Sequence, residues 1–474
     1  MDPSSPSPAN FTQPGRFKTV EEFGLAMAAL GVPIQCDAEL RGRAGPLGQP
    51  LDVYGHTLHN RFAVHPMEGW DGTADGRPSD WTRRRWRRFG RSGAKLIWGG
   101  EAFAVREDGR ANPRQLFCNE TVDVVGDLSE LIEEVRAGHA EVGEDPDELF
   151  VGLQLTHSGR WSCPSESGPA PRIAYHHPVL DARAGISLAD PVLSDAELRE
   201  ILDSYIAAAR VAMQAGFHFV DIKCCHGYLL HELLGAKTRE GDFGGSFENR
   251  TRFFRELVEG VRSACPGLHV ATRVSVCDSV PFHKHASNEV GVPDGIEHRP
   301  WRYGFGIDAE DPRQPDFDDS QQFLGLCREL AVRLVNITVG SPYYCPHLQR
   351  PAAYPPSDGY LPPEDPLLSV AYHLEAVRHC KAAFPDLVLV GSGYSYLQEF
   401  LPGVAQHEVA AGHVDVVGIG RMVLSYPELP LDVLRGDPLQ HKRICRTLSD
   451  CTTSARQGEI SGCYPLDPDY KKLR

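Results

Sequence analysis

A lysine, a histidine and a tyrosine stand within six residues of one another in the stretch "VDIKCCHGYLL", residues 220–230. The stretch reads as the end of an apolar, buried strand, where polar side chains without partners cost several kcal/mol. Some specific chemistry or structure must therefore compensate for burying Lys223, His226 and Tyr228. Cys224 and Cys225 are expected to pack as small hydrophobic residues.

Two other apolar runs also carry polar side chains. Gln154 lies inside "GLQLTHSGRW", residues 152–161, and His157 follows where the run ends. Arg273 lies in the middle of "HVATRVS", residues 269–275. An inward-facing arginine is costly unless it meets an anion or a polarised carbonyl, and a structural ion pair is the alternative.

Glycine-rich turns end the last two apolar runs, "VGSGYS" at residues 390–395 and "VGIGRM" at residues 417–422. Glycine lets backbone N–H groups approach a phosphate closely, and Arg421 can add charge-assisted hydrogen bonds. Turns after the seventh and eighth strands of a barrel commonly bind phosphate. Gly393, Gly420 and Arg421 are therefore candidates for a phosphate site.

The elements that must position these residues follow an α/β pattern. Eight short runs rich in Val, Ile and Leu alternate with helix-like segments, which predicts a (β/α)8 TIM barrel with its active site at the carboxyl ends of the strands. Residues 276–318 and 341–366 are predicted to be long insertions after strands 5 and 6. A doubly wound sheet is the structural alternative. The runs are residues 61–66, 94–102, 149–157, 218–223, 269–275, 333–340, 387–393 and 414–420.

Three segments are the clearest helices, residues 194–216, 248–264 and 369–384. The first begins with Ser194 as a candidate N-cap and has Glu197 three residues later, which is the spacing of a capping box. Its candidate end is a glycine at position 216, as is common at helix C-termini.

Composition narrows the possible partners. The chain has 474 residues and a formal net charge of −16, so that nucleic-acid binding, which needs a basic face, is not expected. No apolar run is long enough to span a bilayer, and the N-terminus lacks a signal-peptide pattern, so we expect a cytoplasmic protein without a membrane partner. We predict a partly disordered N-terminal tail over residues 1–35, a barrel over 36–440 and a short C-terminal extension over 441–474.

Several stretches, in this order and spacing, resemble the Old Yellow Enzyme or NADH:flavin oxidoreductase family. The resemblance is to the barrel domain alone of its 2,4-dienoyl-CoA-reductase-like branch, and it runs from about Leu58 to Leu424. It implies a (β/α)8 barrel that binds FMN. The stretches are "QLTHSGR" (154–160), "AGFHFVDIKCCHGYLLHELL" (215–234), "FGGSFENRTRF" (243–253) and "VDVVGIGR" (414–421).

The resemblance also implies which residues contact the flavin. One group lies along or beneath the ring, a second at its pyrimidine edge and N1, and a third at the phosphate. These are Met67, Glu68 and Ala102 for the ring, Gln154 and Arg273 for the pyrimidine edge and N1, and Gly393, Gly420 and Arg421 for the phosphate.

The implied reaction moves a hydride between NADH or NADPH, the flavin and an activated alkene such as an α,β-unsaturated carbonyl. Tyr228 would be the proton donor to the alkene, and Lys223 and His226 would bind the substrate's carbonyl oxygen. The family usually has histidine where Lys223 stands, and threonine or cysteine where Glu68 stands. These two differences keep open an alternative in which the same barrel oxidises an amine or another C–H donor.

Hypotheses from other classes are a metal-dependent barrel hydrolase, using His157, His226 and Glu68, and a flavin-binding protein without catalysis. The expected partner is a small-molecule substrate, while a homo-oligomer and a separate electron-transfer partner both stay open.

Two sets of residues resemble metal ligands without completing a site. The resemblance to the 2,4-dienoyl-CoA-reductase-like branch implies a four-cysteine iron–sulfur site after the barrel. The tail has Cys445, Cys451 and Cys463, but Leu448 stands where the second ligand of that site should be, so an intact cluster is not expected. The histidines of the long loop lack a compact ligand spacing, and no metal site is expected there. They are His283, His285 and His298.

Overall fold

Parallel strands close into one barrel in the computed structural model, which describes residues 7–474. The hydrogen-bonded order is β4-β3-β13-β12-β11-β8-β7-β6-β5, and a further pairing of β4 with β6 closes the ring. Because β4 and β5 together occupy one strand position of the barrel, the eight predicted strands and the (β/α)8 barrel are confirmed. The strands are β3 Phe62–Val64, β4 Leu96–Ile97, β5 Ala102–Ala104, β6 Phe150–Thr156, β7 Phe219–Cys224, β8 His269–Cys277, β11 Leu334–Val339, β12 Val388–Gly391 and β13 Val416–Ile419.

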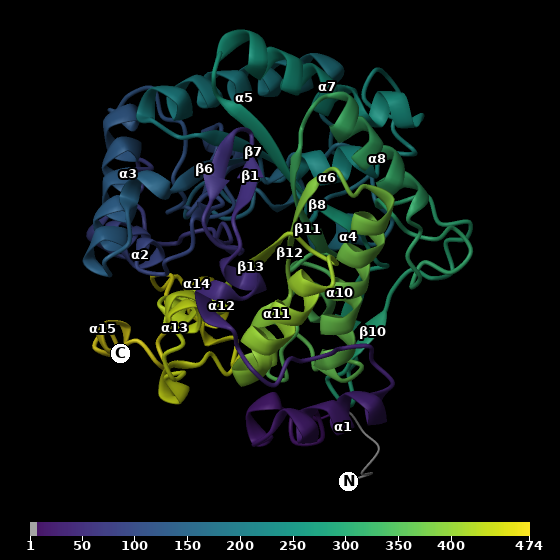
Figure 1. Ribbon diagram of the computed structural model, residues 1–474. Helices are drawn as coiled ribbons and strands as arrows, with labels where there is room; N and C mark the ends of the chain where they lie inside the picture. The colour runs from purple at the N-terminus through teal and green to yellow at the C-terminus, as the bar shows by residue number, and fades with distance from the viewer. Residues whose placement is uncertain (1–6) are drawn as a thin grey trace.

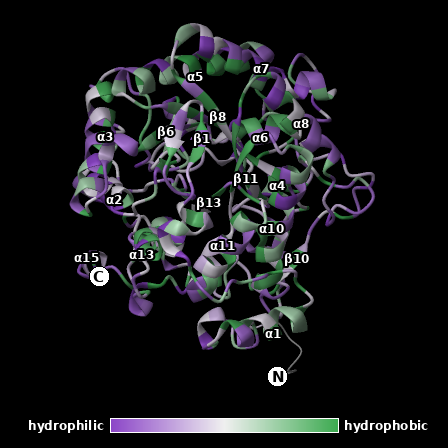
Figure 2. Ribbon diagram, in the orientation of Figure 1, coloured by the Kyte–Doolittle hydropathy of each residue, from purple (hydrophilic) through white to green (hydrophobic). Residues whose placement is uncertain are grey.

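A ring of helices surrounds the strands (Figure 1). Apolar residues colour the central strands, whereas the outer helices carry many hydrophilic residues (Figure 2), as expected when each helix buries one stripe against the barrel. The helices of the ring are α2 Asp80–Gly90, α3 Val124–Glu141, α5 Asp195–Ala215, α7 Phe247–Ala264, α8 Asp318–Glu329, α10 Pro366–Ala383 and α11 Leu401–Ala410.

Helix α5 begins and ends as its sequence predicts. The Ser194 hydroxyl accepts a hydrogen bond from the Glu197 N–H, and the Glu197 carboxylate accepts one from the Ser194 N–H, which completes the capping box. Gly216 follows the last turn with φ of 97°, in the left-handed region that favours glycine.

The amino end of the barrel is filled and closed. Large side chains such as Trp98, Phe150 and Phe219 pack inside it. A hairpin of β1 Leu51–Val53 and β2 His56–Leu58 lies across this end, where the hydroxyl of Tyr54 in its turn donates to the carbonyl of Val270 at 2.6 Å. Space for a ligand is therefore left at the carboxyl end of the strands.

Both predicted insertions are present. Residues 276–318 contain a small hairpin of β9 Phe282–Lys284 and β10 Gly291–Pro293. Residues 341–366 contain one short helix, α9 Pro346–Gln349. Further short helices within the barrel region are α4 Leu180–Arg183, α6 Leu229–Leu234, α12 Arg421–Ser425 and α13 Leu429–Arg435.

The two ends of the described chain both pack on the barrel. In the segment predicted to be a partly disordered tail, helix α1 Val20–Leu30 stacks Phe23 on Phe400, with ring centroids 4.4 Å apart, while residues 1–6 lie outside the described residues. The C-terminal extension contains α14 Asp450–Arg456 and α15 Pro468–Lys471. Among residues 7–474 we find no helix that combines the length and the apolar character needed to cross a membrane.

Candidate active site

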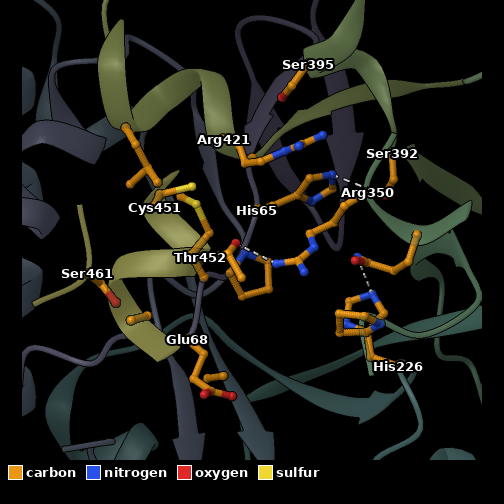
Figure 3. Close-up of a pocket in the computed structure, with 18 of the residues that line it drawn as sticks. His65, Glu68, His226, Arg350, Ser392, Ser395, Arg421, Cys451, Thr452 and Ser461 are labelled. Carbon is orange, nitrogen blue, oxygen red and sulfur yellow. Dashed lines mark hydrogen bonds between the residues drawn. The ribbon is translucent and has the colours of Figure 1, made fainter. Parts of the chain in front are cut away.

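A cavity of about 300 Å³ opens at the carboxyl ends of the barrel strands (Figure 3). All eleven residues predicted as site residues line it, although they come from seven strand ends or loops. They are Met67, Glu68, Ala102, Gln154, Lys223, His226, Tyr228, Arg273, Gly393, Gly420 and Arg421. Tyr343, which follows the sixth strand, also lines it, as do residues not predicted, of which the most prominent are His65, Arg350, Ser392 and Thr452.

A fully buried carboxylate, Asp221 on β7, sets the orientation of two predicted residues. One of its oxygens accepts hydrogen bonds from the Gln154 amide and from the Trp98 indole N–H, both at 2.6 Å. The other accepts the backbone N–H of Arg273 at 2.7 Å. Burial raises the pKa of Asp221, and these donors oppose the shift. The Gln154 amide is thereby fixed with its nitrogen toward Asp221.

Arg273 is a buried guanidinium without a carboxylate partner in the described chain. It is 6% exposed, and its Nη2 donates to the Ser392 hydroxyl at 3.3 Å. Its Nε has no hydrogen-bond partner among residues 7–474. Such an unpaired donor fits a ligand that offers an acceptor with negative charge.

His65, at the end of β3, lies beside Arg273 and was missed by sequence reasoning. Its Nε2 is 3.2 Å from the Ser392 hydroxyl, and its Nδ1 is 3.0 Å from the Asn336 amide. Burial lowers the pKa of His65 well below its ordinary value, and the positive charge of Arg273 adds to the effect. The signal available was its place in "RFAVHP", directly after the first strand.

A second group of cations lies near the glycine-rich turns. Arg421 donates to the Pro351 carbonyl at 2.7 Å, and Arg350 donates to the Thr452 hydroxyl at 2.7 Å. Neither arginine has a carboxylate within ion-pair distance in the described chain, and Nη2 of Arg350 is buried without a partner there. Burial, followed by the charges of neighbouring arginines, lowers the pKa of Arg350 to about 9. In Figure 3 Arg350 reaches across the middle of the pocket.

Gly393 shows why one of these turns requires glycine. Its φ is 93°, and a Cβ at this position would lie 2.8 Å from Cγ of His373. The turn can therefore pass close to its neighbours and leave its backbone facing the cavity. Together with Arg350 and Arg421 it forms a cradle that fits a phosphate group.

The opposite part of the pocket gathers Lys223, His226 and Tyr228. The Lys223 ammonium lies 3.6 Å from the centroid of the Tyr228 ring. The Tyr228 hydroxyl is hydrogen-bonded to the Glu68 carboxylate and, at 2.9 Å, to the hydroxyl of Tyr343. Lys223 and Tyr228 are 5% and 3% exposed, so that most of their surface is shielded from water.

Burial shifts the protonation of all three groups in a consistent way. It raises the pKa of Tyr228 well above its ordinary value, with Glu68 adding to the shift. It lowers the pKa of Lys223, and it lowers the pKa of His226 well below its usual range with help from Arg273 and Lys223. Near neutral pH the phenol therefore keeps its proton and the imidazole is neutral.

His226 has a backbone conformation that its neighbours hold in place. Its φ is 66°, which is uncommon for a residue with a side chain. Its N–H donates to the Ser275 hydroxyl at 3.1 Å, and its carbonyl accepts from the Ser341 hydroxyl at 2.7 Å. Strain of this kind persists where the surrounding structure fixes it, as it does at many functional sites.

Met67 lies over a buried ion-pair network centred on Arg85. The guanidinium bonds to Asp71 at 2.7 and 2.9 Å, to Glu101 at 2.6 Å and to the carbonyl of Met67 at 3.4 Å. Glu101 also accepts the backbone N–H of Gly69 at 2.8 Å. Charge-assisted hydrogen bonds from Arg85 and Glu101 therefore fix the backbone of the segment after β3.

The residues weighed as metal ligands in the tail and the long loop lie in two separate places. Within residues 7–474, no three His, Cys, Asp or Glu side chains are arranged so that they could hold a metal ion. Cys445, Cys451 and Cys463 do line one small cavity with Leu448, next to Arg421. The three loop histidines, His283, His285 and His298, are all exposed.

A parallel barrel with a polar, cation-rich pocket at the carboxyl ends of its strands has the architecture of a (β/α)8 enzyme. The chain belongs to the NADH:flavin oxidoreductase / NADH oxidase family, whose model matches residues 46–298. Among curated relatives, an NADPH dehydrogenase of Geobacillus sp. (strain WCH70) is 30% identical over 243 residues, which are 50% of this chain and 64% of that protein. The chain thus spans less than two thirds of the length of that relative.

Solved structures share the fold. The match to a 2-naphthoyl-CoA reductase has a TM-score of 0.64 at 19% identity and covers 90% of this chain and 57% of the other. For histamine dehydrogenase from Rhizobium sp. 4-9 the TM-score is 0.62 at 20% identity, covering 91% and 53%. For Old Yellow Enzyme from Pichia sp. AKU4542 it is 0.57 at 20% identity, covering 84% and 89%.

Proposed function

We propose that the chain is an FMN-dependent oxidoreductase that passes a hydride from NADH or NADPH to an activated alkene such as an α,β-unsaturated carbonyl. One observation carries the proposal. Among residues 7–474, one cavity has cations without carboxylate partners along one part and a protonated phenol, Tyr228, in another. Family membership and the NADPH dehydrogenases among the relatives support it.

The residues present fit FMN. Gly393, Arg421 and Arg350 would hold the phosphate, because they offer backbone and guanidinium donors, and neither arginine has a carboxylate within ion-pair distance among the described residues. Arg273 and Gln154 would contact the pyrimidine part of the flavin, and the unpartnered Nε of Arg273 would gain an acceptor there. Along the ring we place Met67, Glu68 and Ala102, which line the same cavity.

Bound FMN would supply the hydride chemistry, and the protein would bind and protonate the substrate. Lys223 and His226 would donate hydrogen bonds to the substrate's carbonyl oxygen, where negative charge develops. Tyr228 would donate its proton to the α-carbon, because its raised pKa keeps the phenol protonated at neutral pH. The surrounding burial excludes water from these groups.

A comparison of Tyr228→Phe with the native protein tests this assignment. Loss of the phenolic proton should lower kcat for NADPH-dependent reduction of cyclohexenone by about 10²-fold or more, the usual worth of a positioned acid. A matched control is Tyr344→Phe, which removes a buried phenol that bonds to Asp278 outside the pocket. Full activity of Tyr228→Phe would contradict the role of Tyr228, and enone-independent NADPH oxidation alone would contradict the function.

Oxidation of an amine or another C–H donor is the second candidate. The observation that favours it is the hydrogen bond between Glu68 and Tyr228, since an ionised carboxylate beside a phenol can accept a proton. A flavin that amines reduce and NAD(P)H does not would establish this alternative.

The source of electrons and the compartment are also proposals. We propose free NADH or NADPH as the electron donor and a cytoplasmic location. The thirteen cysteines all lie within residues 7–474 and none is in a disulfide there, which suits a reducing compartment.

A further inference from the structure

The Tyr228 hydroxyl is the middle of a chain of three acidic side chains from separate elements. Glu68 follows β3, Tyr228 immediately precedes α6, and Tyr343 lies in the loop after β11. The Tyr228 hydroxyl contacts the Glu68 carboxylate on one side and the Tyr343 hydroxyl on the other, with 2.9 Å between the two hydroxyl oxygens.

Each outer member of this chain is fixed by a different neighbour. The second carboxylate oxygen of Glu68 accepts a hydrogen bond from the Asn112 amide at 3.0 Å. The Tyr343 ring stacks on Trp161, with centroids 4.6 Å apart and planes 5° from parallel. Because Asn112 fixes Glu68 and Trp161 fixes Tyr343, both contacts with Tyr228 are preorganised.

The single proton of each phenol decides what Tyr228 can do. While Glu68 is ionised, Tyr228 donates its proton to the carboxylate, and Tyr343 donates to Tyr228. In that arrangement Tyr228 has no proton left for a substrate. When Glu68 carries a proton, it can donate to the Tyr228 oxygen instead, and the phenolic proton is free to face the cavity.

We propose that Glu68 resupplies the proton that Tyr228 gives to the substrate, and that Tyr343 is a positioning residue that orients the Tyr228 hydroxyl. The inference rests on the proposed function. In each turnover the hydride that originates from NAD(P)H forms a C–H bond at the β-carbon. The Tyr228 O–H bond breaks as a C–H bond forms at the α-carbon, and the Glu68 O–H bond breaks as that of Tyr228 forms again. One NAD(P)H and one solvent proton are consumed.

Access to water agrees with this direction of transfer. Tyr228 is 3% exposed, whereas Glu68 and Tyr343 are only half-buried. A proton from solvent can therefore reach Glu68 more directly than it can reach Tyr228. The charged or titratable groups that face Glu68 are Tyr228, Tyr343 and Lys223, while Arg350 and Arg456 act on Tyr343.

The variant Glu68→Gln keeps the size of the side chain and its ability to hydrogen-bond but holds no transferable proton. Reoxidation of the reduced holoenzyme by cyclohexenone is measured as a function of pH, apart from reduction by NADPH. In the native protein we expect this step to slow as pH rises, because a carboxyl resupplies a proton only while it carries one. Glu68→Gln should be slower by about tenfold or more and should lack this pH dependence. Glu68→Asp should restore it in part.

Tyr343→Phe separates orientation from proton supply. It should slow the same step a few-fold and keep the native pH dependence, whereas Tyr344→Phe should change neither. An infrared titration gives a readout that does not depend on turnover. Beyond the bands of other carboxyl groups, the native protein should show one pH-dependent carboxyl band that Glu68→Gln lacks.

The outcomes separate a failure of the proton relay from Glu68 to Tyr228 from a failure of the proposed function on which the relay rests. If NADPH fails to reduce the flavin or an enone fails to reoxidise it, the proposed function is wrong. If both steps occur but Glu68→Gln keeps the native rate and pH dependence, the relay is overturned. Absence of a carboxyl band assignable to Glu68 overturns the relay whatever the turnover results are.

Discussion

At the scale of single residues, buried cations divide into those with carboxylate partners and those without. Arg85 and Arg160 are buried and each contacts two carboxylates. Arg273 and Lys223 are equally buried but have no carboxylate within ion-pair distance in the described chain. An unpaired buried charge costs several kcal/mol, so these two positions disfavour the ligand-free fold and favour a ligand that supplies negative charge.

Arg273 gives a prediction that follows from this cost. Arg273→Gln should weaken FMN binding by at least tenfold, because the ligand loses a cationic donor. It should leave the thermal stability of the FMN-free protein unchanged or higher, because an unpaired buried charge is removed. Fluorescence titration with FMN and thermal unfolding of the stripped protein measure the two effects.

The matched control for this prediction is Arg313→Gln, at an exposed arginine that pairs with Asp311. It should change neither quantity. Unaltered FMN affinity in Arg273→Gln would contradict the proposed contact between this residue and the flavin.

Sequence reasoning could bring the strand-end residues to one cavity, but it could not place most of the loop residues that line it. Lys223, Tyr228 and Arg273 could be predicted to meet in one pocket because parallel strands bring their carboxyl ends together. The sequence gives Tyr343 and Arg350 no role beyond their place in the long loop after the sixth strand. Both lie in a loop whose path is set by tertiary contacts, such as the stacking of Tyr343 on Trp161, and not by any periodic pattern.

At the scale of elements, the second strand of the barrel shows what the apolar pattern can predict and what it cannot. The run at residues 94–102 was predicted as one strand, but the structure has two, β4 and β5. Gly99 and Gly100, with φ of 156° and 48°, lie between them, and a Cβ on Gly100 would be 2.8 Å from the Trp86 ring. The apolar pattern predicted a barrel strand at this place, whereas its division into β4 and β5 depends on the close approach of Gly100 to helix α2.

The C-terminal extension is an element that forms part of the pocket wall. Helix α14 brings Thr452 to Arg350, and Ser461 accepts the backbone N–H of Trp70 at 2.8 Å. Arg84 on α2 holds the extension through two bonds of 2.9 Å to Asp467, whose side chain is fully buried. The shape of the pocket therefore depends on how the C-terminal extension is docked on the barrel.

This dependence predicts the effect of Arg84→Met. Leaving a buried carboxylate with a weaker partner should destabilise docking of the extension by about 3 kcal/mol. Hydrogen exchange should increase over residues 450–471, and FMN affinity should fall. Arg83→Met removes an exposed pair with Glu130 on the same helix and should do neither. Equal exchange in the two variants would show that Arg84 does not hold the extension.

At the scale of the whole molecule, the barrel is closed at one end and open to ligands at the other. The hairpin of β1 and β2 and the large side chains behind it fill the amino end. The long loops and the C-terminal extension surround the carboxyl end, where all predicted site residues lie. The alternation of eight apolar runs predicted the barrel, with a doubly wound sheet as the alternative, but the packing of the extension onto it rests on pairs such as Arg84 and Asp467 that no local pattern reveals.

The most direct test of the account is an anaerobic spectrum of the purified protein, recorded first with NADPH or NADH and then with cyclohexenone. We expect a bound flavin to lose its visible absorbance on addition of the nicotinamide and to regain it on addition of the enone. A protein without flavin absorbance, or a flavin that neither nicotinamide reduces, would contradict it.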